Sequence, residues 1–94
     1  MIFALIGILK QPPPTRSATF EAELNEHLSP HFMRIVSAGY LRDANGGPIG
    51  VMGLIEAIDF PQAQAFLDSS PFTLGGHYEH VHLAAFDIEV GRLG

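Results

Sequence analysis

An uninterrupted apolar run, IFALIGIL at residues 2–9, constrains the fold of this chain most strongly. The run is too short to span a bilayer, and it lacks the basic n-region of a signal peptide. Lys10 and the three prolines at residues 12–14 end it. Strands covered on both faces show continuous apolar runs instead of alternation. The sequence therefore predicts a β-strand at residues 2–9 that needs a covering layer on each side.

A helix and two strands follow this run. Apolar residues at every fourth position, Phe20, Leu24 and Leu28, predict an amphipathic helix over residues 17–28, before the helix-breaking Pro30. Residues 31–41 (HFMRIVSAGYL) and 48–57 (PIGVMGLIEA) then have the pattern of antiparallel strands. The Asn-Gly pair between them is the strongest reversal signal in the chain.

A second helix and a last strand complete the pattern. Asp59 fits an N-cap, Pro61 is tolerated in the first helical turn, and Gln62 can complete a capping box. After a loop at residues 72–76 (FTLGG), the last strand is expected over residues 79–90. The order β-α-β-β-α-β predicts a ferredoxin-like α+β fold with an antiparallel sheet and both helices on one face.

The 94 residues form one domain, 1–94, because a second core would not fit. The other face of the sheet would stay bare, although the last strand is largely apolar on both sides. Val81, Leu83 and Ala85 point one way, and His80, His82, Ala84, Phe86 and Ile88 point the other. Charged residues make up only 16% of the chain, too few to cover so much surface. We therefore expect a homodimer with two sheets packed face to face, a dimeric α+β barrel that encloses a cavity.

Composition excludes several classes of function. The formal net charge is −5, with five Lys and Arg residues, so no basic patch is available for nucleic acid or for an anionic membrane. The absence of cysteine removes disulfides and thiolate chemistry and suits a cytoplasmic location. Dinucleotide-binding, P-loop and nucleophile-elbow motifs are absent as well. We expect no cofactor, and we expect a small organic ligand or substrate besides the second subunit.

The opening MIFALI and the stretch AGYLRDANGGPIGVMGLIEAIDFPQAQAFLDSSPFTLGGHYEHVHLAAFDI carry a family resemblance in the order and spacing of their motifs. They resemble the YciI-like (YCII-related) family. The resemblance implies a dimeric α+β barrel whose subunits each hold a histidine–aspartate pair in a cleft. Most members have no established reaction. A few resemble small lyases or isomerases of ring-derived compounds, including a dehydrochlorinase of chlorinated hydroquinones, and the family requires no metal.

Asp43 matches the family's aspartate, four residues after Gly39. A carboxylate at a strand end beside an apolar cavity could orient an imidazole and stabilise its protonated form. The alternative is that Asp43 only starts the turn, a position that Asp favours in any case.

His27 is the candidate partner, because the family's histidine precedes a leucine on the first helix and His27-Leu28 is that pair here. The match requires a deletion before the second strand. Without the deletion, the aligned position lies nearer Phe20 or Glu21. The alternative for His27 is an exposed histidine near a helix C-terminus, where the helix dipole favours its charge.

Two residues depart from the family pattern. Tyr40 stands where the family has a proline, and Ser70, before Pro71, stands where it has an aspartate. Tyr40 could bring a phenol to the cleft, although a strand tyrosine with a satisfied hydroxyl is the commoner case. We treat both residues as candidate substrate-binding groups, and the missing acid at Ser70 places the family's usual chemistry in question.

Three histidines cluster in HYEHVH, at His77, His80 and His82. His80 and His82 share a strand face and could bind zinc or copper, but no third ligand is apparent, because His77 lies in the loop and Glu79 faces the other way. The preferred interpretation has no metal. His80 and His82 then either line the cavity as acid–base groups, possible substitutes for His27 beside Asp43, or lie hydrated at the strand's mouth.

Two functional hypotheses follow. The first is a small lyase or isomerase in which Asp43 orients the imidazole of His27, His80 or His82, and this imidazole moves a proton on a compact organic acid or phenolic compound. The second is a non-catalytic dimeric module that binds a small ligand. A metal-dependent version of the first would use His80 and His82 as ligands.

Overall fold

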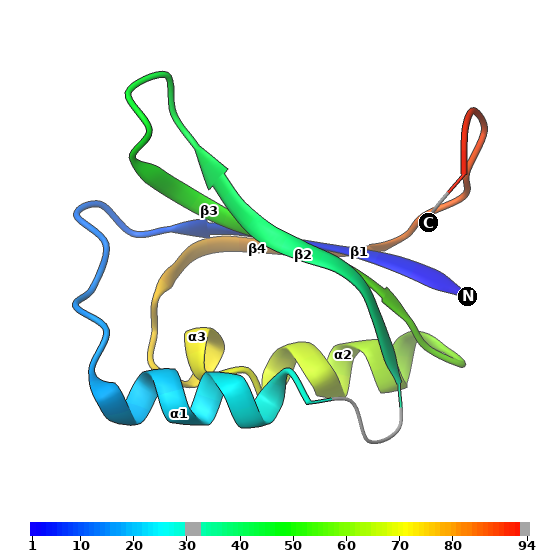
Figure 1. Cartoon of the computed structure of the whole chain (residues 1–94). Helices are drawn as coiled ribbons and strands as arrows, with labels where there is room; N and C mark the ends of the chain where they lie inside the picture. The colour runs from blue at the N-terminus through cyan, green and yellow to red at the C-terminus, as the bar shows by residue number, and fades with distance from the viewer. Residues whose placement is uncertain (30–32, 93–94) are drawn as a thin grey trace.

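The computed structural model describes residues 1–29 and 33–92 of the chain. Within this part, four strands form one sheet and three helices accompany them (Figure 1). In chain order the elements are β1 (Ile2–Leu9), α1 (Ala18–His27), β2 (Arg34–Arg42), β3 (Pro48–Glu56), α2 (Phe60–Asp68), α3 (Pro71–Leu74) and β4 (Tyr78–Ala85).

The sheet has the strand order β2-β3-β1-β4, and every neighbouring pair is antiparallel. This is the ferredoxin-like α+β arrangement, so the predicted fold is confirmed. The apolar run of the N-terminus occupies a central strand, where Leu5 lies opposite Gly53 of β3 and Leu83 of β4. A central position explains why this strand carries no polar residue on either face.

All three helices lie on one side of the sheet (Figure 1). Alternate residues of β1 point toward them, and Phe3, Leu5 and Leu9 are buried there. The centre of the core joins Phe3 of β1, Ile55 of β3 and Ala63 of α2, which are at most 1% exposed. No helix in the described residues combines the length and the apolar character that crossing a bilayer requires.

The other side of the sheet has no covering layer among the described residues, and we call it the open face. On this face Ile6 lies between Met52 of β3 and His82 of β4. The register assigns the following residues to it: Ile2, Ala4, Ile6, Ile8, Arg34, Ser37, Gly39, Leu41, Gly50, Met52, Leu54, Glu56, His80, His82 and Ala84. Most of them are apolar, as the continuous pattern of β1 requires.

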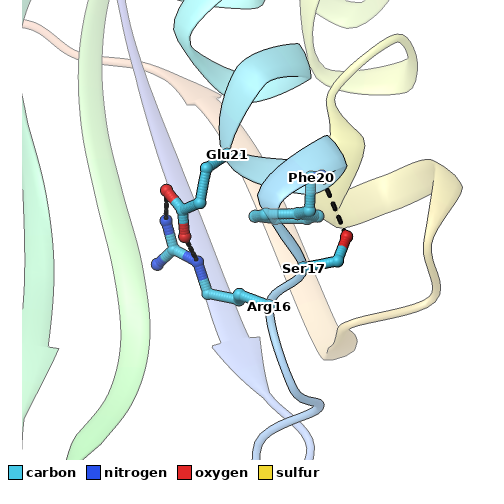
Figure 2. A network of polar contacts seen from close by, with 4 residues as sticks. All are labelled: Arg16, Ser17, Phe20 and Glu21. Carbon is cyan, nitrogen blue, oxygen red and sulfur yellow. Dashed lines mark hydrogen bonds and ion pairs between the residues drawn. The ribbon is translucent and has the colours of Figure 1, made fainter.

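The helix starts follow the sequence signals. The Ser17 hydroxyl accepts a hydrogen bond from the Phe20 N–H at 3.0 Å, which begins α1 (Figure 2). Asp59 caps α2 as predicted, because its Oδ1 accepts from the Gln62 N–H at 2.9 Å. The Gln62 side chain in turn accepts from the Ile58 N–H at 2.8 Å, one residue before the partner that a standard capping box would use.

Three expectations about element bounds need correction. The last strand ends at Ala85 and not at residue 90, because its partner β1 begins at Ile2 and offers nothing to pair beyond Phe86. The expected loop at residues 72–76 contains α3, since Ser70 and the following proline supply an N-cap and an N1 residue. The described part of β2 begins at Arg34, and residues 31 and 32 of the predicted strand lie outside the described residues.

Gly7 provides a test of this packing. A Cβ at Gly7 would collide with the Tyr78 ring, which lies over β1 at this point. We expect Gly7→Ala to lower the free energy of unfolding by roughly 1–3 kcal/mol in urea titrations, the usual cost of overpacking. Gly53→Ala is the matched control, because its Cβ would meet nothing closer than 3.9 Å. Equal stability of the two variants would contradict this packing of Tyr78.

Candidate functional site

A cavity of about 220 Å³ lies between α1 and the helix-facing side of β2 and β3. Its apolar lining consists of Leu5, Leu24, Leu28, Ile35, Ala38, Gly39, Val51, Met52, Gly53, Ile55, Phe66 and Phe72. Its polar lining consists of His27, Tyr40, Ser70 and Tyr78. No Asp or Glu occurs among the described residues that line it. The cavity is therefore suited to a largely apolar compound with a few polar groups.

Helix α1 is held over the sheet by aromatic contacts at both ends. Near its start, the Phe20 ring packs edge-on against Phe72, with 5.0 Å between centroids, and stacks on His77 at 4.6 Å. At its end, the His27 ring stacks on Phe66 of α2 at 4.3 Å. Within Ala18–His27 no residue is fully buried. The middle of α1 thus does not press onto the sheet.

Small residues of the sheet lie below this middle section. Ala38 of β2 is paired with Gly53 of β3, and both line the cavity. Leu24 of α1 lines it from the helix side. Small side chains on the sheet leave the space unfilled. A dry apolar cavity of about 150 Å³ suffices for benzene, so the volume here accommodates a compound of one ring.

His27 is the titratable group at the α1–α2 side of the cavity. Its ring is half-buried, and its Nε2 is buried without a hydrogen-bond partner among the described residues. Burial lowers the pKa of this imidazole below its ordinary value, and a backbone hydrogen bond at Phe66 opposes the shift only in part. At neutral pH His27 is therefore uncharged and able to accept a proton.

Tyr78 and Ser70 form the polar part of the cavity wall near α3. Burial raises the pKa of Tyr78 to about 12, while a hydrogen bond with the Ser70 side chain works in the opposite direction. Its phenol therefore stays protonated and can donate a hydrogen bond. The buried Ser70 hydroxyl also accepts from the Phe72 N–H at 3.3 Å, so α3 holds it in place.

Tyr40 lines the cavity from β2 and is 41% exposed. Two guanidinium groups lie near its ring: Arg16 at 5.4 Å and Arg42 at 5.7 Å from the centroid. Such cation–π contacts restrict the movement of the Tyr40 ring. Tyr40 is therefore placed at the cavity's edge between positive charges.

Asp43 lies in the β2–β3 hairpin and does not line the cavity. Its Oδ1 accepts hydrogen bonds from the N–H groups of Asn45 and Gly47, both at 2.9 Å. The backbone of Asp43 is also paired with Gly47. The carboxylate thus stabilises the turn through local backbone contacts, which was the structural alternative for this residue.

His80 and His82 lie on the open face, opposite Ile8 and Ile6 of β1. Both are exposed in the single chain and stand on the side of the sheet away from α1. The fold therefore separates them from the cavity that contains His27. In residues 1–29 and 33–92, no group of three His, Cys, Asp or Glu residues could hold a metal ion.

A wider pocket of about 350 Å³ shares His27, Ile35 and Phe66 with the cavity. Glu23 and Glu26 of α1 line it on the outside. Its acidic lining disfavours the organic acids that the sequence suggested as ligands, because like charges repel. We therefore take the apolar cavity as the candidate site.

Several site residues were missed at the level of sequence. Tyr78 precedes the predicted last strand, and Phe66 and Phe72 resemble ordinary core residues there. Gly7 inside an apolar strand was the available signal, since a strand glycine often marks close approach of another group. His27, Tyr40 and Ser70 were predicted from the sequence, and the structure places all three around one cavity.

Comparison with known proteins supports the fold. The structure resembles that of 5-chloro-2-hydroxyhydroquinone dehydrochlorinase (TftG) from Burkholderia phenoliruptrix AC1100, solved in complex with 2,5-dihydroxybenzoquinone. The TM-score is 0.72, the sequence identity is 16%, and the match covers 93% of this chain and 94% of the other. No family model and no curated protein sequence matches the chain. At this identity the likeness shows a shared fold.

His77 predicts a dependence of stability on pH. It is 6% exposed, and burial, followed by the charges of Arg16 and Lys10, lowers its pKa from the ordinary 6.5. Below pH 6.5 the unfolded chain therefore binds more protons than the folded chain, down to the lowered pKa of the folded state. The free energy of unfolding should be highest above pH 6.5 and fall as the pH is lowered from 6.5 toward the pKa of the folded state.

Urea titrations between about pH 7.5 and pH 5 check this expectation. The decline below pH 6.5 should be shallower in His77→Gln than in the wild-type protein. Identical pH profiles of the two proteins would show that His77 contributes nothing to this linkage.

Proposed function

We propose that this chain is a YciI-like protein that acts as a small lyase or isomerase on a compact phenolic compound or organic acid. One observation carries the proposal: an apolar cavity of one-ring size with the uncharged His27 in its wall. The family resemblance of the sequence supports it. A shared fold with a dehydrochlorinase of a hydroxyhydroquinone supports it further.

His27 is the proposed acid–base group. An imidazole with a lowered pKa is present as the base at neutral pH, and its Nε2 has no competing partner in the described residues. Such a group can take a proton from a substrate hydroxyl or carbon and return it to another atom, as an isomerase requires. In a lyase reaction, the same proton removal accompanies the departure of a leaving group.

The hydroxyl groups of Tyr78, Ser70 and Tyr40 are the proposed binding groups. Tyr78 remains a hydrogen-bond donor because its pKa is about 12. Donors of this kind stabilise the oxygen of a ring-bound oxyanion. The apolar remainder of the lining excludes water and strengthens these contacts.

We propose supporting roles for the other candidate residues. Asp43 fixes the hairpin that follows Tyr40, through its contacts with Asn45 and Gly47. His80 and His82 belong to the open face, which we propose as the interface between two copies of the chain. The apolar residues of that face and the small share of charged residues, 16%, support this homodimer.

The role of His27 is tested with substrates. Chloride release from 5-chloro-2-hydroxyhydroquinone is the first assay, followed by a panel of phenolic and organic acids. With a substrate that the protein converts, His27→Gln should lower kcat by about 10²–10⁴-fold, because it removes the group that transfers the proton. His82→Gln discriminates between the histidines: a loss of activity there, with His27→Gln active, would contradict the assignment.

A binding module without catalysis is the second candidate. The contacts of Asp43 favour this candidate. Its Oδ1 accepts hydrogen bonds from two backbone N–H groups, and the residue does not line the cavity, so it cannot orient His27 there. Saturable binding of such a compound by the wild-type protein, with no product over the whole panel, would establish the module and remove the enzyme.

The homodimer is tested by mass in solution. Sedimentation equilibrium should give twice the chain mass of 10.2 kDa. Ile6→Lys places a charge in the centre of the open face and should shift the protein to the monomer, because an unpaired charge is costly to bury. Ala65→Lys, on the exposed side of α2, is the control and should remain dimeric. A monomeric wild-type protein at micromolar concentration would contradict the interface.

A further inference from the structure

Positive charge gathers at one end of the candidate cavity. Lys10, Arg16 and Arg42 supply three of the five Lys and Arg residues of a chain whose net charge is −5. Arg16 and Arg42 both lie near the Tyr40 ring, and Arg16 and Lys10 both act on the buried His77. The β1–α1 connection and the β2–β3 hairpin meet at this end (Figure 1), where the Gln11 side chain donates to the Pro48 carbonyl at 3.4 Å.

Arg16 is the cation best placed to act on a bound ligand. Its guanidinium carbon lies 5.4 Å from the ring centroids of both Tyr40 and Phe72. These two rings line the cavity. A planar guanidinium beside aromatic rings is suited to recognise the carboxylate or oxyanion of a planar ring compound, because it presents paired N–H donors in a rigid geometry.

Arg16 is at present paired with Glu21 (Figure 2). The guanidinium Nη2 donates to the carboxylate at 2.9 Å, and Nε lies 2.7 Å from the other carboxylate oxygen. The pair is bidentate, but the Glu21 side chain is 49% exposed, so its carboxylate can turn into water when another anion takes its place on Arg16. The anionic group of a ligand can therefore compete with Glu21 for Arg16.

The acidic groups near this end do not cancel its charge. Asp43 of the hairpin directs Oδ1 to backbone N–H groups of its own turn. Glu21 is the acid in contact with Arg16 among the described residues, and the cavity itself has no acidic residue in its described lining. A negative ligand group at this end therefore meets three cations, Lys10, Arg16 and Arg42, against two carboxylates, of which that of Glu21 is exchangeable.

We propose that Arg16 determines specificity by binding the anionic group of a planar ring compound whose ring lies in the cavity, in exchange for Glu21. This inference rests on the proposed function, which places the ligand in the cavity, and it further specifies that the ligand is negatively charged. Arg16 then selects anionic planar ring compounds over neutral ones of similar shape.

The test compares two quinones that differ in charge. The acidic hydroxyl groups of 2,5-dihydroxybenzoquinone are ionised at neutral pH, whereas 2,5-dimethoxybenzoquinone is neutral. Isothermal titration calorimetry of each with the wild-type protein, Arg16→Gln and Glu21→Gln gives the affinities. Arg34→Gln is the matched control, because Arg34 forms a similar exposed pair with Glu56 at 3.2 Å on the open face of the sheet, opposite to the cavity.

We expect Arg16→Gln to weaken binding of the anionic quinone on the order of tenfold to a hundredfold, the usual effect of losing a charge-assisted hydrogen bond. Binding of the neutral quinone should change less than about twofold, since it makes no such bond. Glu21→Gln should tighten binding of the anionic quinone severalfold, because a competing carboxylate is removed. Arg34→Gln should bind both quinones as the wild-type protein does.

A purely structural role for Arg16 gives different results. Arg16→Gln would then weaken both quinones equally, and Glu21→Gln would leave the anionic quinone unchanged or weaken it. Either result overturns the role of Arg16 and leaves the proposed ligand site intact. If Arg16→Gln does not fold by circular dichroism, Glu21→Gln alone decides the question. Failure of both quinones to bind the wild-type protein would overturn the ligand class of the proposed function together with this inference.

Discussion

Two aromatic contacts, one edge-on and one stacked, determine how far α1 stands from the sheet, and the candidate site depends on that distance. Phe20 meets Phe72 at the start of the helix, and His27 meets Phe66 at its end, with 5.0 Å and 4.3 Å between centroids. Aromatic pairs of this kind contribute roughly 0.5–1.5 kcal/mol each beyond the area they bury. Because no residue within Ala18–His27 is fully buried, these two aromatic contacts supply much of what holds the helix in place.

The same geometry explains the chemistry that we assign to the cavity. His27 has two roles: its ring packs on Phe66 and helps to hold α1, and the burial that results from this packing lowers its pKa. Tyr78 likewise packs over Gly7 and keeps its proton because it is buried. Arg16 lies at the other end of the helix, near the Tyr40 ring. A base at one end of α1 and a cation at the other make the two ends of the cavity chemically different.

The sequence predicted the element order and the fold because apolar periodicity and capping residues act locally. Ser17 caps α1 and Asp59 caps α2, and the apolar periodicity of the residues that follow each cap predicts the helix. The cavity was beyond such reasoning, since it depends on contacts between residues far apart in the chain, such as the pairing of Ala38 with Gly53 and the stacking of His27 on Phe66. The catalytic role of Asp43 was expected from the resemblance, whereas its contacts with the hairpin backbone agree with the alternative that Asp favours the start of a turn.

The position of a bound ligand tests the central claim most directly. Intermolecular nuclear Overhauser effects between the ring protons of 2,5-dihydroxybenzoquinone and assigned protein side chains would locate it. The account predicts contacts with His27, Leu24 and Tyr78, which line the cavity. Contacts with Ile6 and His82 instead would place the ligand on the open face and contradict the assignment of the site.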